Sequence, residues 1–409
     1  MEQVIERGAG LDVHKKSVTA CVRVPGPEGG RRQEVQTFGT TAAALLTLRD
    51  WLSVHGVTHV AMESTGVYWK PVYYVLEERF TCLLVNAAHV SKVPGRKTDV
   101  RDCEWLAQLL EHGLLRGSFV PPVPIRELRD LTRYRAVLVQ DRTREANRLH
   151  KVLTDAGIQL ASVATNVLGK SGRAMLAALV EGTSDPAVLA DLAQGKLRRK
   201  LPALREALAG HFRGHHAFLV SQLLAHLDYL DEALDVLTAQ IQEALSPFAS
   251  EAARLDAIPG VGARTAEVLI AEIGVDMRQF PTARHLASWA GLCPGTHESA
   301  GKRRAVRTRK GNHWLRAALI EAALAAINVR DSALAARYRR LVRHCGHKKA
   351  IVAVAHKMLT TAYLLLADGR AYQEPGAGYY DAQRKDRLVR RALHTLEQQG
   401  YRVTLELAA

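Results

Sequence analysis

The first 120 residues of the chain alternate between two hydrophobic periods, one of two residues and one of about 3.6. Val18, Ala20 and Val22 alternate with polar neighbours and predict a strand over residues 9–24. Further strands are predicted over residues 33–40, 57–64 and 80–87, and helices over 41–56, 67–79 and 98–113. Because the strands come first and then alternate with helices, we expect a layered α/β domain that ends near residue 124.

After residue 124 the pattern becomes almost continuous Leu- and Ala-rich helix, over residues 125–250. Leu149 and Leu153 lie on one helical face, as in an amphipathic helix. Another face carries three cations at helical spacing, Arg144, Arg148 and Lys151. Two interpretations of that face stay open: a solvated surface of a long bundle or coiled-coil helix, and a contact surface for nucleic acid.

A third region, residues 251–372, opens with LDAIPGVGARTAEVLIAEIG, in which Pro-Gly-Val-Gly separates two helical patterns. Gly260 and Gly262 let the backbone turn tightly, so that the amides opening the second helix can point at a phosphate oxygen. This order is typical of a helix–hairpin–helix motif that contacts nucleic acid, and a plain helical hairpin is the alternative. From the charged tail over residues 373–409 we predict no element.

The distribution of charge along the chain indicates a kind of binding partner. The formal net charge is +15, and residues 296–350 contain 14 Lys or Arg residues and three acids, a surplus of 11. A protein this basic usually binds a polyanion. The concentration of the charge in one segment indicates a dedicated nucleic-acid surface.

The cysteines and the hydropathy of the chain indicate in which cellular compartment the protein is expected. The five cysteines are scattered without a CxxC pair, which fits a reducing cytosol and argues against a disulfide framework or a cysteine zinc site. The first 20 residues contain acids and no apolar core, and no uncharged apolar run reaches about 18 residues. We therefore expect a cytoplasmic, DNA-associated protein with neither a signal peptide nor a membrane span.

Four acids of the α/β region stand where metal chemistry would need them: Asp12, Glu63, Asp99 and Asp102. Asp12 lies in an apolar strand, and burying it without a partner would cost several kcal/mol, so we expect it to have a cation or hydrogen bonds. Two-metal phosphoryl transfer needs carboxylates that converge from separate elements, and Mg²⁺ prefers such oxygen ligands. Taken singly, each acid also has a structural interpretation, as a helix cap, a turn residue or a solvated side chain.

A polar loop, HESAGKRRAVRTRKG over residues 297–311, holds one serine, Ser299, followed by six cations. A serine hydroxyl is a weak nucleophile until a base, a metal or cations assist it, and His297 is a candidate base. Cations beside the serine can hold a phosphate and stabilise charge on its oxygens. The candidates are Lys302, Arg303, Arg304, Arg307, Arg309 and Lys310 in the loop and Arg316 in the helix that follows. The alternative is a basic loop that only contacts the phosphate backbone.

Five segments resemble, in order, the signature segments of the IS one-ten family of bacterial insertion-sequence transposases. They are GLDVHKKSVTACV, AMESTGVYWKPV, KTDVRDCEWLAQLL, IPGVGARTAEVLIAEIG, and GLCPGTHESAGKRR with KGNHWLRAALIEAA, and the likeness runs from about Leu11 to Leu365. Where the family commonly has Ser-Ser-Gly-Gly-Lys, this chain has Glu-Ser-Ala-Gly-Lys. Ser299 is therefore left as the single serine of its loop.

The resemblance implies a RuvC-like domain of the ribonuclease H superfamily over residues 1–124, with a magnesium-binding DEDD set: Asp12, Glu63, Asp99 and Asp102. It implies a helical, coiled-coil assembly region over 125–250 and a mostly helical transposase domain over 251–372. Ser299 would be the nucleophile that forms a covalent 5′-phosphoserine link to DNA. A structured non-coding bridge RNA would pair with donor and target DNA. The carboxylates of one protomer would face the serine of another, in a homo-oligomer that is a dimer and becomes a tetramer in the synaptic complex.

Two other functions fit parts of the pattern. A ribonuclease H-like nuclease or junction resolvase would use water as the nucleophile and would form no covalent adduct. An architectural or RNA-binding protein would use its acids structurally and would need no Mg²⁺. The expected burial of Asp12 argues against the second of these functions.

Overall fold

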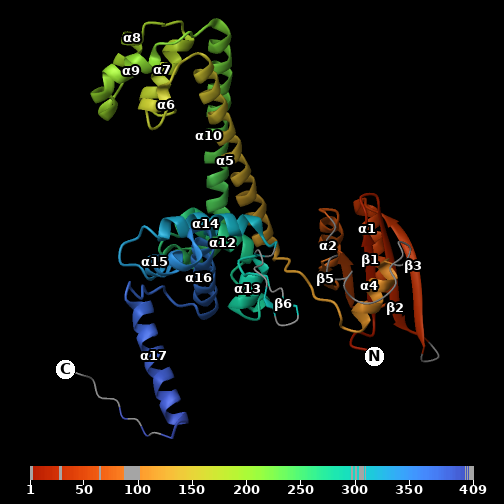
Figure 1. Cartoon of the computed structure of the whole chain (residues 1–409). Coiled ribbons are helices and arrows are strands. Elements are labelled where there is room, and N and C mark those ends of the chain that lie inside the picture. Colours follow the sequence, from red (N-terminus) through yellow and green to blue (C-terminus); the bar gives the residue numbers. More distant parts are fainter. Residues whose placement is uncertain are drawn as a thin grey trace. The chain divides into compact units, whose positions relative to one another are not determined.

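The computed structural model describes residues 3–26, 30–63, 66–86, 102–295, 298–299, 302–303, 308, 310–400, 402 and 404, and of residues 298–299, 302–303 and 381–388 it describes the backbone. The chain forms two compact units, Met1–Val120 and Pro121–Ala409. The first unit is a mixed α/β structure and the second is mostly helical (Figure 1). The predicted combination of α/β and all-α parts is confirmed at this level.

The first unit is built on a five-stranded mixed sheet with the order β3-β2-β1-β4-β5. Its strands are β1 (Gly8–Val13), β2 (Ser17–Pro25), β3 (Arg31–Gly39), β4 (His59–Glu63) and β5 (Thr81–Val85). The pairs β1–β2 and β2–β3 are antiparallel, whereas β1–β4 and β4–β5 are parallel. The helices described in this unit are α1 (Ala42–Val54), α2 (Trp69–Leu76) and α4 (Asp102–Glu111).

One predicted element of this unit is wrong, because residues 9–24 form two strands and not one. The amide of His14 donates to the carbonyl oxygen of Ser17 at 2.9 Å and closes a tight turn between β1 and β2. Three consecutive polar side chains, His14, Lys15 and Lys16, explain the turn. A continuous strand would place at least one of them on a covered face of the sheet, where an unpaired charge is unfavourable.

The two faces of the sheet are covered by different helices. Leu11 of β1 packs in one core with Leu48 of α1 and Leu76 of α2. On the opposite face, a side chain at Gly10 would overlap the carbonyl oxygen of Cys103, so this glycine lets the backbone of α4 lie directly on β1. Because side chains alternate along a strand, neighbouring residues of β1 face different helices.

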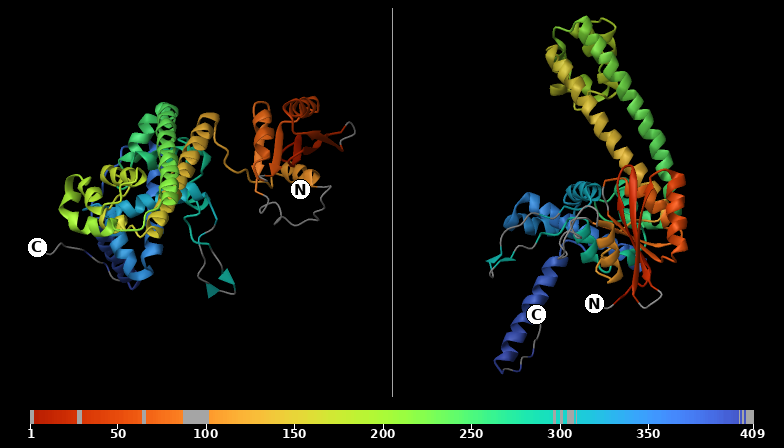
Figure 2. Two further views of the ribbon diagram at one scale, coloured as in Figure 1. Left: turned by 90° about the horizontal axis from the view of Figure 1, so that it is seen from above. Right: turned by 90° about the vertical axis from the view of Figure 1, so that its right-hand side faces the viewer.

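The second unit is organised around two long antiparallel helices, α5 (Val123–Asp155) and α10 (Gly214–Leu245) (Figure 2). Arg142 of α5 pairs with Asp231 of α10, and Glu145 pairs with His226. One end of the pair carries a helical cap of α6 (Leu160–Val163), α7 (Lys170–Val180), α8 (Pro186–Asp191), η2 (Gly195–Lys200) and α9 (Leu201–Leu208). Leu149 and Leu153 are buried in the core of this cap, as the amphipathic pattern predicts.

A cluster of helices packs at the other end of the α5–α10 pair. It contains η3 (Ser246–Phe248), α11 (Ala249–Asp256), α12 (Ala263–Ile273), η4 (Met277–Gln279), α13 (Ala283–Trp289), α14 (His313–Ala326), α15 (Ala333–Cys345) and α16 (His347–Asp368), and α17 (Tyr379–Gln398) follows. By length and composition α16 could cross a membrane, but half of its apolar window is buried and it packs against α13, α14 and α15. Its hydrophobicity is that of a central core helix.

Candidate functional site

Asp12 and Glu63 lie at the same edge of the sheet. β1 and β4 are parallel neighbours, and Leu11 of β1 stands opposite Met62 of β4. Asp12 and Glu63 are the next residue on each strand, at the carboxyl ends, where neighbouring parallel strands are about 4.8 Å apart. The register of the sheet therefore brings together two acids that are 51 residues apart in the sequence.

Asp102 joins these two acids from the face of the sheet that α4 covers. Asp12 is two residues beyond Gly10, and Glu63 is two residues beyond Ala61, which packs against leucines of α4, so both acids point to the α4 side. Asp102 is the first residue of α4, next to the Cys103 carbonyl that lies over Gly10. Three of the four predicted acids thus lie around one end of the sheet on the same face, although their carboxylate oxygens are not all within 4.8 Å of one another.

The charge of Asp12 also acts on the first turn of α4. Burial raises the pKa of the Cys103 thiol to about 11, and the charges of Glu104 and Asp12 act in the same direction. Asp12 is therefore close enough to the first turn of α4 to act on its charges. The Oδ1 atom of Asp102 is itself buried.

Asp12 is less buried than its apolar neighbours suggest. Its side chain is 24% exposed, whereas Leu11 and Val13 are almost fully buried, and its Oδ2 atom lies 3.1 Å from Nε2 of His14. Asp12 is half-buried because it lies near the open end of β1, one residue before the strand ends. The expected hydrogen-bond partner is present, and access to solvent remains.

The donor chemistry of this edge suits a divalent metal ion. Asp12, Glu63 and Asp102 come from three separate elements and offer carboxylate oxygens, the ligands that hard cations such as Mg²⁺ prefer. Asp99, the fourth predicted acid, and the predicted cap before α4 lie outside the described residues. We call the three described acids the carboxylate edge.

A different group of possible metal ligands occurs in the second unit, where Asp155, His215 and His216 approach one another. The Nδ1 atom of His216 accepts the backbone amide of Arg213 at 3.1 Å, so its proton is on Nε2, which faces Asp155 at 3.1 Å. That nitrogen donates to the carboxylate and has no lone pair for a metal. The group is therefore explained as a helix cap at the start of α10.

The predicted serine loop contains a short β-hairpin. β6 (Glu298–Ser299) and β7 (Lys302–Arg303) are antiparallel, with Ser299 opposite Lys302. Pro294 and Thr308 form a further antiparallel bridge nearer the helices. Among the described residues of the predicted loop, backbone pairing is thus present at these positions, and Ser299 is the last residue of β6. We call residues 292–311 the serine arm.

The remaining predicted residues of the serine arm and Arg316 differ in exposure, and some of them lie outside the described residues. Lys310 is exposed. Four predicted residues lie outside the described ones: His297, Arg304, Arg307 and Arg309. Arg316, in α14, is half-buried, and its Nη1 atom donates to the Gly291 carbonyl at 2.9 Å and to the Thr308 hydroxyl at 2.7 Å. These bonds tie the two ends of the arm together, a structural contact that the sequence pattern did not indicate.

Glu272 of α12 supports the end of the arm from inside the protein. It is fully buried, and its carboxylate accepts two hydrogen bonds from Arg133 of α5 at 2.7 and 2.8 Å. It also accepts from Nδ2 of Asn312, whose Oδ1 atom caps the N-terminus of α14. Sequence reasoning missed this residue, although an acid inside the apolar run EVLIAEIG was a usable signal.

Replacing Glu272 with alanine is expected to lower the free energy of unfolding of the second unit by about 1.5–3 kcal/mol, because the half-buried side chains of Arg133 and Asn312 would lose their shared charged acceptor. Chemical denaturation followed by circular dichroism measures the change. Glu321→Ala, at an exposed glutamate of α14, is the matched control and should alter stability by less than about 0.5 kcal/mol. Equal stability of the two variants would contradict the support assigned to Glu272.

The helix–hairpin–helix pattern is present as α11, a tight turn and α12. Gly260 has a φ of 83°, and a side chain there would overlap the backbone of α14 at Ala322, so this glycine serves the packing of the turn on α14. Gly262 is the N-cap residue of α12 and is exposed, with open space around its Cα among the described residues. The amides that open α12 next to Gly262 are thus available to an anion.

Two of the three cations predicted on one face of α5 form ion pairs with acids of the same helix. Arg144 pairs with Asp141, and Arg148 pairs with Glu145, each three residues earlier. Lys151 is exposed. Paired surface cations on one helix are what a solvated face of a long helix pair presents, and their exposure also leaves them accessible to nucleic acid.

Two models of known protein families match this chain. The family model for DEDD transposases of the IS110 type matches residues 9–158, which contain the four acids, and the model described as Transposase IS116/IS110/IS902 family matches residues 252–339, which contain Ser299.

Individual proteins resemble the chain over most of its length. It is 29% identical to the insertion element IS110 43.6 kDa protein of Streptomyces coelicolor, over 68% of this chain and 73% of that protein. It is 29% identical to a probable family 20 transposase of Pseudomonas aeruginosa, over 78% of this chain and 86% of that protein. A shorter match, 33% identical, joins 30% of this chain to 39% of a pilin gene-inverting protein of Moraxella bovis.

Proposed function

Because the chain belongs to the IS116/IS110/IS902 family of insertion-sequence transposases and is a DNA transposase, we propose that it cuts and rejoins DNA strands through a covalent link between Ser299 and a 5′-phosphate. In this proposal Asp12, Glu63, Asp99 and Asp102 hold Mg²⁺. The observation that carries the proposal is that Asp12, Glu63 and Asp102, from three separate elements, all lie at the carboxylate edge. The sheet, with three antiparallel strands followed by two parallel ones, fits the RuvC-like, ribonuclease H-like fold that the resemblance implies.

In the proposed reaction, one phosphodiester bond of the DNA is exchanged for a phosphodiester bond to Ser299. The hydroxyl oxygen of Ser299 attacks the scissile phosphorus, the bond from phosphorus to the 3′ oxygen breaks, and that oxygen leaves as a hydroxyl with the proton that Ser299 has lost. A 3′ hydroxyl of a second strand reverses the step and releases Ser299. Lys302 and Arg303, on the strand opposite Ser299, hold the phosphate oxygens. Bound Mg²⁺ would supply Lewis-acid polarisation of the phosphate.

The proposal includes three partners. Donor and target DNA are the substrates, and a structured non-coding bridge RNA selects the sites. The chain acts as a homo-oligomer, a dimer that becomes a tetramer in the synaptic complex. The acids and Ser299 belong to different compact units, which is compatible with a composite site made by the carboxylates of one protomer and the serine of another. The gene inversion in the name of the Moraxella relative supports a recombination reaction.

A covalent adduct is the test of the proposal. Purified protein with its co-purifying RNA is incubated with Mg²⁺ and labelled DNA that carries an end of the insertion sequence, and the mixture is then denatured. We expect a protein–DNA adduct, and peptide mapping should place the nucleotide on Ser299. Strand cleavage that proceeds at full rate with no adduct would favour the other candidate, a ribonuclease H-like nuclease or junction resolvase that uses water.

The helix–hairpin–helix assignment makes a separate prediction about binding. Gly262→Asp adds a negative charge at an exposed N-cap, where aspartate stabilises a helix, so the fold should be retained. The same charge would repel a phosphate at the start of α12, and we expect DNA affinity to fall by about tenfold at low salt. Fluorescence anisotropy measures this, with Gly262→Asn as the uncharged control. Equal affinity of the two variants would show that phosphate does not bind at this turn.

A further inference from the structure

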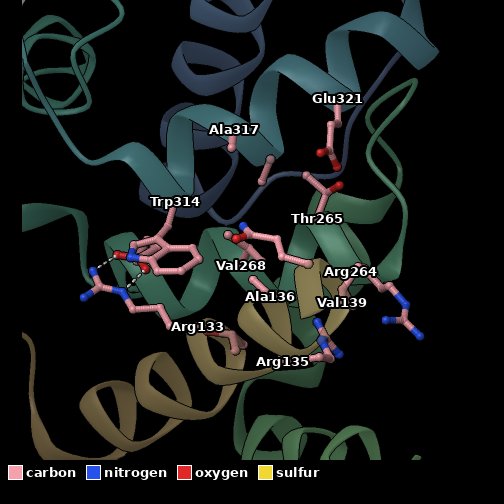
Figure 3. A pocket seen from close by; sticks show the side chains of 14 residues that line it. Arg133, Arg135, Ala136, Val139, Arg264, Thr265, Val268, Trp314, Ala317 and Glu321 are labelled. Atoms are coloured by element: carbon pink, nitrogen blue, oxygen red, sulfur yellow. Dashed lines mark hydrogen bonds and ion pairs between the residues drawn. The ribbon is translucent and has the colours of Figure 1, made fainter. Parts of the chain in front are cut away.

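A pocket with a volume of about 280 cubic ångströms lies between α5, α12 and α14, beside the helix–hairpin–helix turn (Figure 3). Its volume is slightly smaller than the roughly 300–1,000 cubic ångströms that small-molecule sites usually occupy. Its volume suits one planar ring system. The proposed cleavage chemistry leaves this pocket without a role.

The walls of the pocket are largely apolar. Val139 of α5, Val268 of α12 and Ala317 of α14 line three sides. Trp314 extends from α14 over α5 and α12, and its ring forms one wall (Figure 3). An accessible indole next to aliphatic walls is a stacking surface for a flat, weakly polar ring.

One polar group at this pocket lacks a partner. Arg135 lines the pocket and is 4% exposed; one side of its guanidinium pairs with the buried Glu267. Its Nη1 atom is buried and has no hydrogen-bond partner among the described residues. A buried donor without an acceptor is unfavourable, so an acceptor carried in by a ligand would be favoured.

The position of the pocket indicates the source of that ligand. Thr265, three residues after the exposed N-cap Gly262, lines the pocket, so its wall begins about 4.5 Å along α12 from the turn. A nucleotide whose phosphate is held at the start of α12 therefore has its base within reach of the pocket. The exposed Arg264 lines the same opening and adds positive charge.

We propose that the pocket between α5, α12 and α14 receives one unstacked nucleobase of a nucleic-acid strand held at the helix–hairpin–helix turn. Trp314 provides the stacking surface, and Arg135 donates to an acceptor on the base edge, such as a pyrimidine carbonyl oxygen. This inference rests on the proposed phosphate contact at Gly262, and it adds recognition of a single-stranded or distorted segment next to that contact.

The experiment compares two labelled 12-nucleotide single strands, oligothymidylate and the same backbone with abasic sites, using the full chain. We expect about tenfold tighter binding of the strand with bases. Ala317→Phe fills the pocket from an exposed helix position and should abolish that preference, while its affinity for the abasic strand stays unchanged. Ala325→Phe, at an exposed alanine of the same helix outside the pocket, is the matched control and should keep the preference.

Folding of each variant is checked by its melting temperature, and Val139→Phe narrows the pocket from α5 as an independent test. Retention of the full preference for bases in both filled variants would overturn the base-binding assignment. Gly262→Asp separates this failure from that of the underlying proposal. If Gly262→Asp weakens both strands while the filled variants behave like the parent, the phosphate contact stands and the pocket is not a base site. If neither kind of variant changes binding, both assignments are wrong.

Discussion

Replacing Ser299 with alanine is expected to abolish the covalent protein–DNA adduct and to lower strand cleavage by a factor on the order of 10⁵ to 10⁶, as the loss of a catalytic nucleophile does elsewhere. β6 and β7 pair through their backbones, and this pairing does not depend on the hydroxyl. The variant should therefore bind DNA with unchanged affinity. Gel analysis of denatured reactions and anisotropy measure the two quantities.

The control for this variant is Ser288→Ala, at an exposed serine of α13 in the same unit. It should form the adduct at the rate of the parent protein. An adduct that persists in Ser299→Ala would assign the covalent link to another residue. Loss of both adduct and DNA binding would show that the substitution had disturbed the serine arm as a whole.

Asp12→Asn is expected to reduce Mg²⁺-dependent cleavage by roughly 10³-fold, since removal of one anionic ligand withdraws several kcal/mol of metal-assisted stabilisation of the transition state. The substitution keeps the shape of the side chain and the contact with His14, so the sheet should remain intact. In the parent protein, Mg²⁺ binding to the folded state should raise the melting temperature. The variant should show a smaller rise.

Asp50→Asn removes an exposed carboxylate of α1 in the same unit and is the matched control for this measurement. It should retain both the cleavage rate and the effect of Mg²⁺ on melting. Full activity of Asp12→Asn, with an unchanged response to Mg²⁺, would favour an architectural role in which the acids are structural. Cleavage and melting together separate a loss of metal binding from a loss of folding.

Much of the fold was predictable because its signals are local. Thr41 accepts the amide of Ala44 and caps α1 where the pattern places the helix start, and Gly56 has the positive φ expected after its end. The early turn after Asp12 was not predicted, because apolar residues alternate on both sides of it. Three polar residues were the only local sign of the reversal.

The sequence by itself predicted the chemistry of the candidate site: oxygen ligands at Asp12, Glu63 and Asp102, one serine among cations, and a Gly-containing turn before a helix. Their residue types and order along the chain sufficed for that. The placement of the three acids at one edge depends on the pairing of β1 with β4 and on the close approach of α4 at Gly10, which are contacts between distant parts of the chain. Such contacts leave no periodic trace in the sequence.

The same distinction explains the residues that take other roles in the fold. Arg316 is predicted to bind phosphate because it is a cation in a basic segment, and the folded chain adds bonds from its Nη1 atom to Gly291 and Thr308. Glu272 resembled one more helix acid, yet it is fully buried and holds the start of α14 to α5. Charge and propensity belong to each residue and can be read along the chain. Burial and partner choice depend on which distant groups the packed helices bring within hydrogen-bond distance, and only the folded chain determines them.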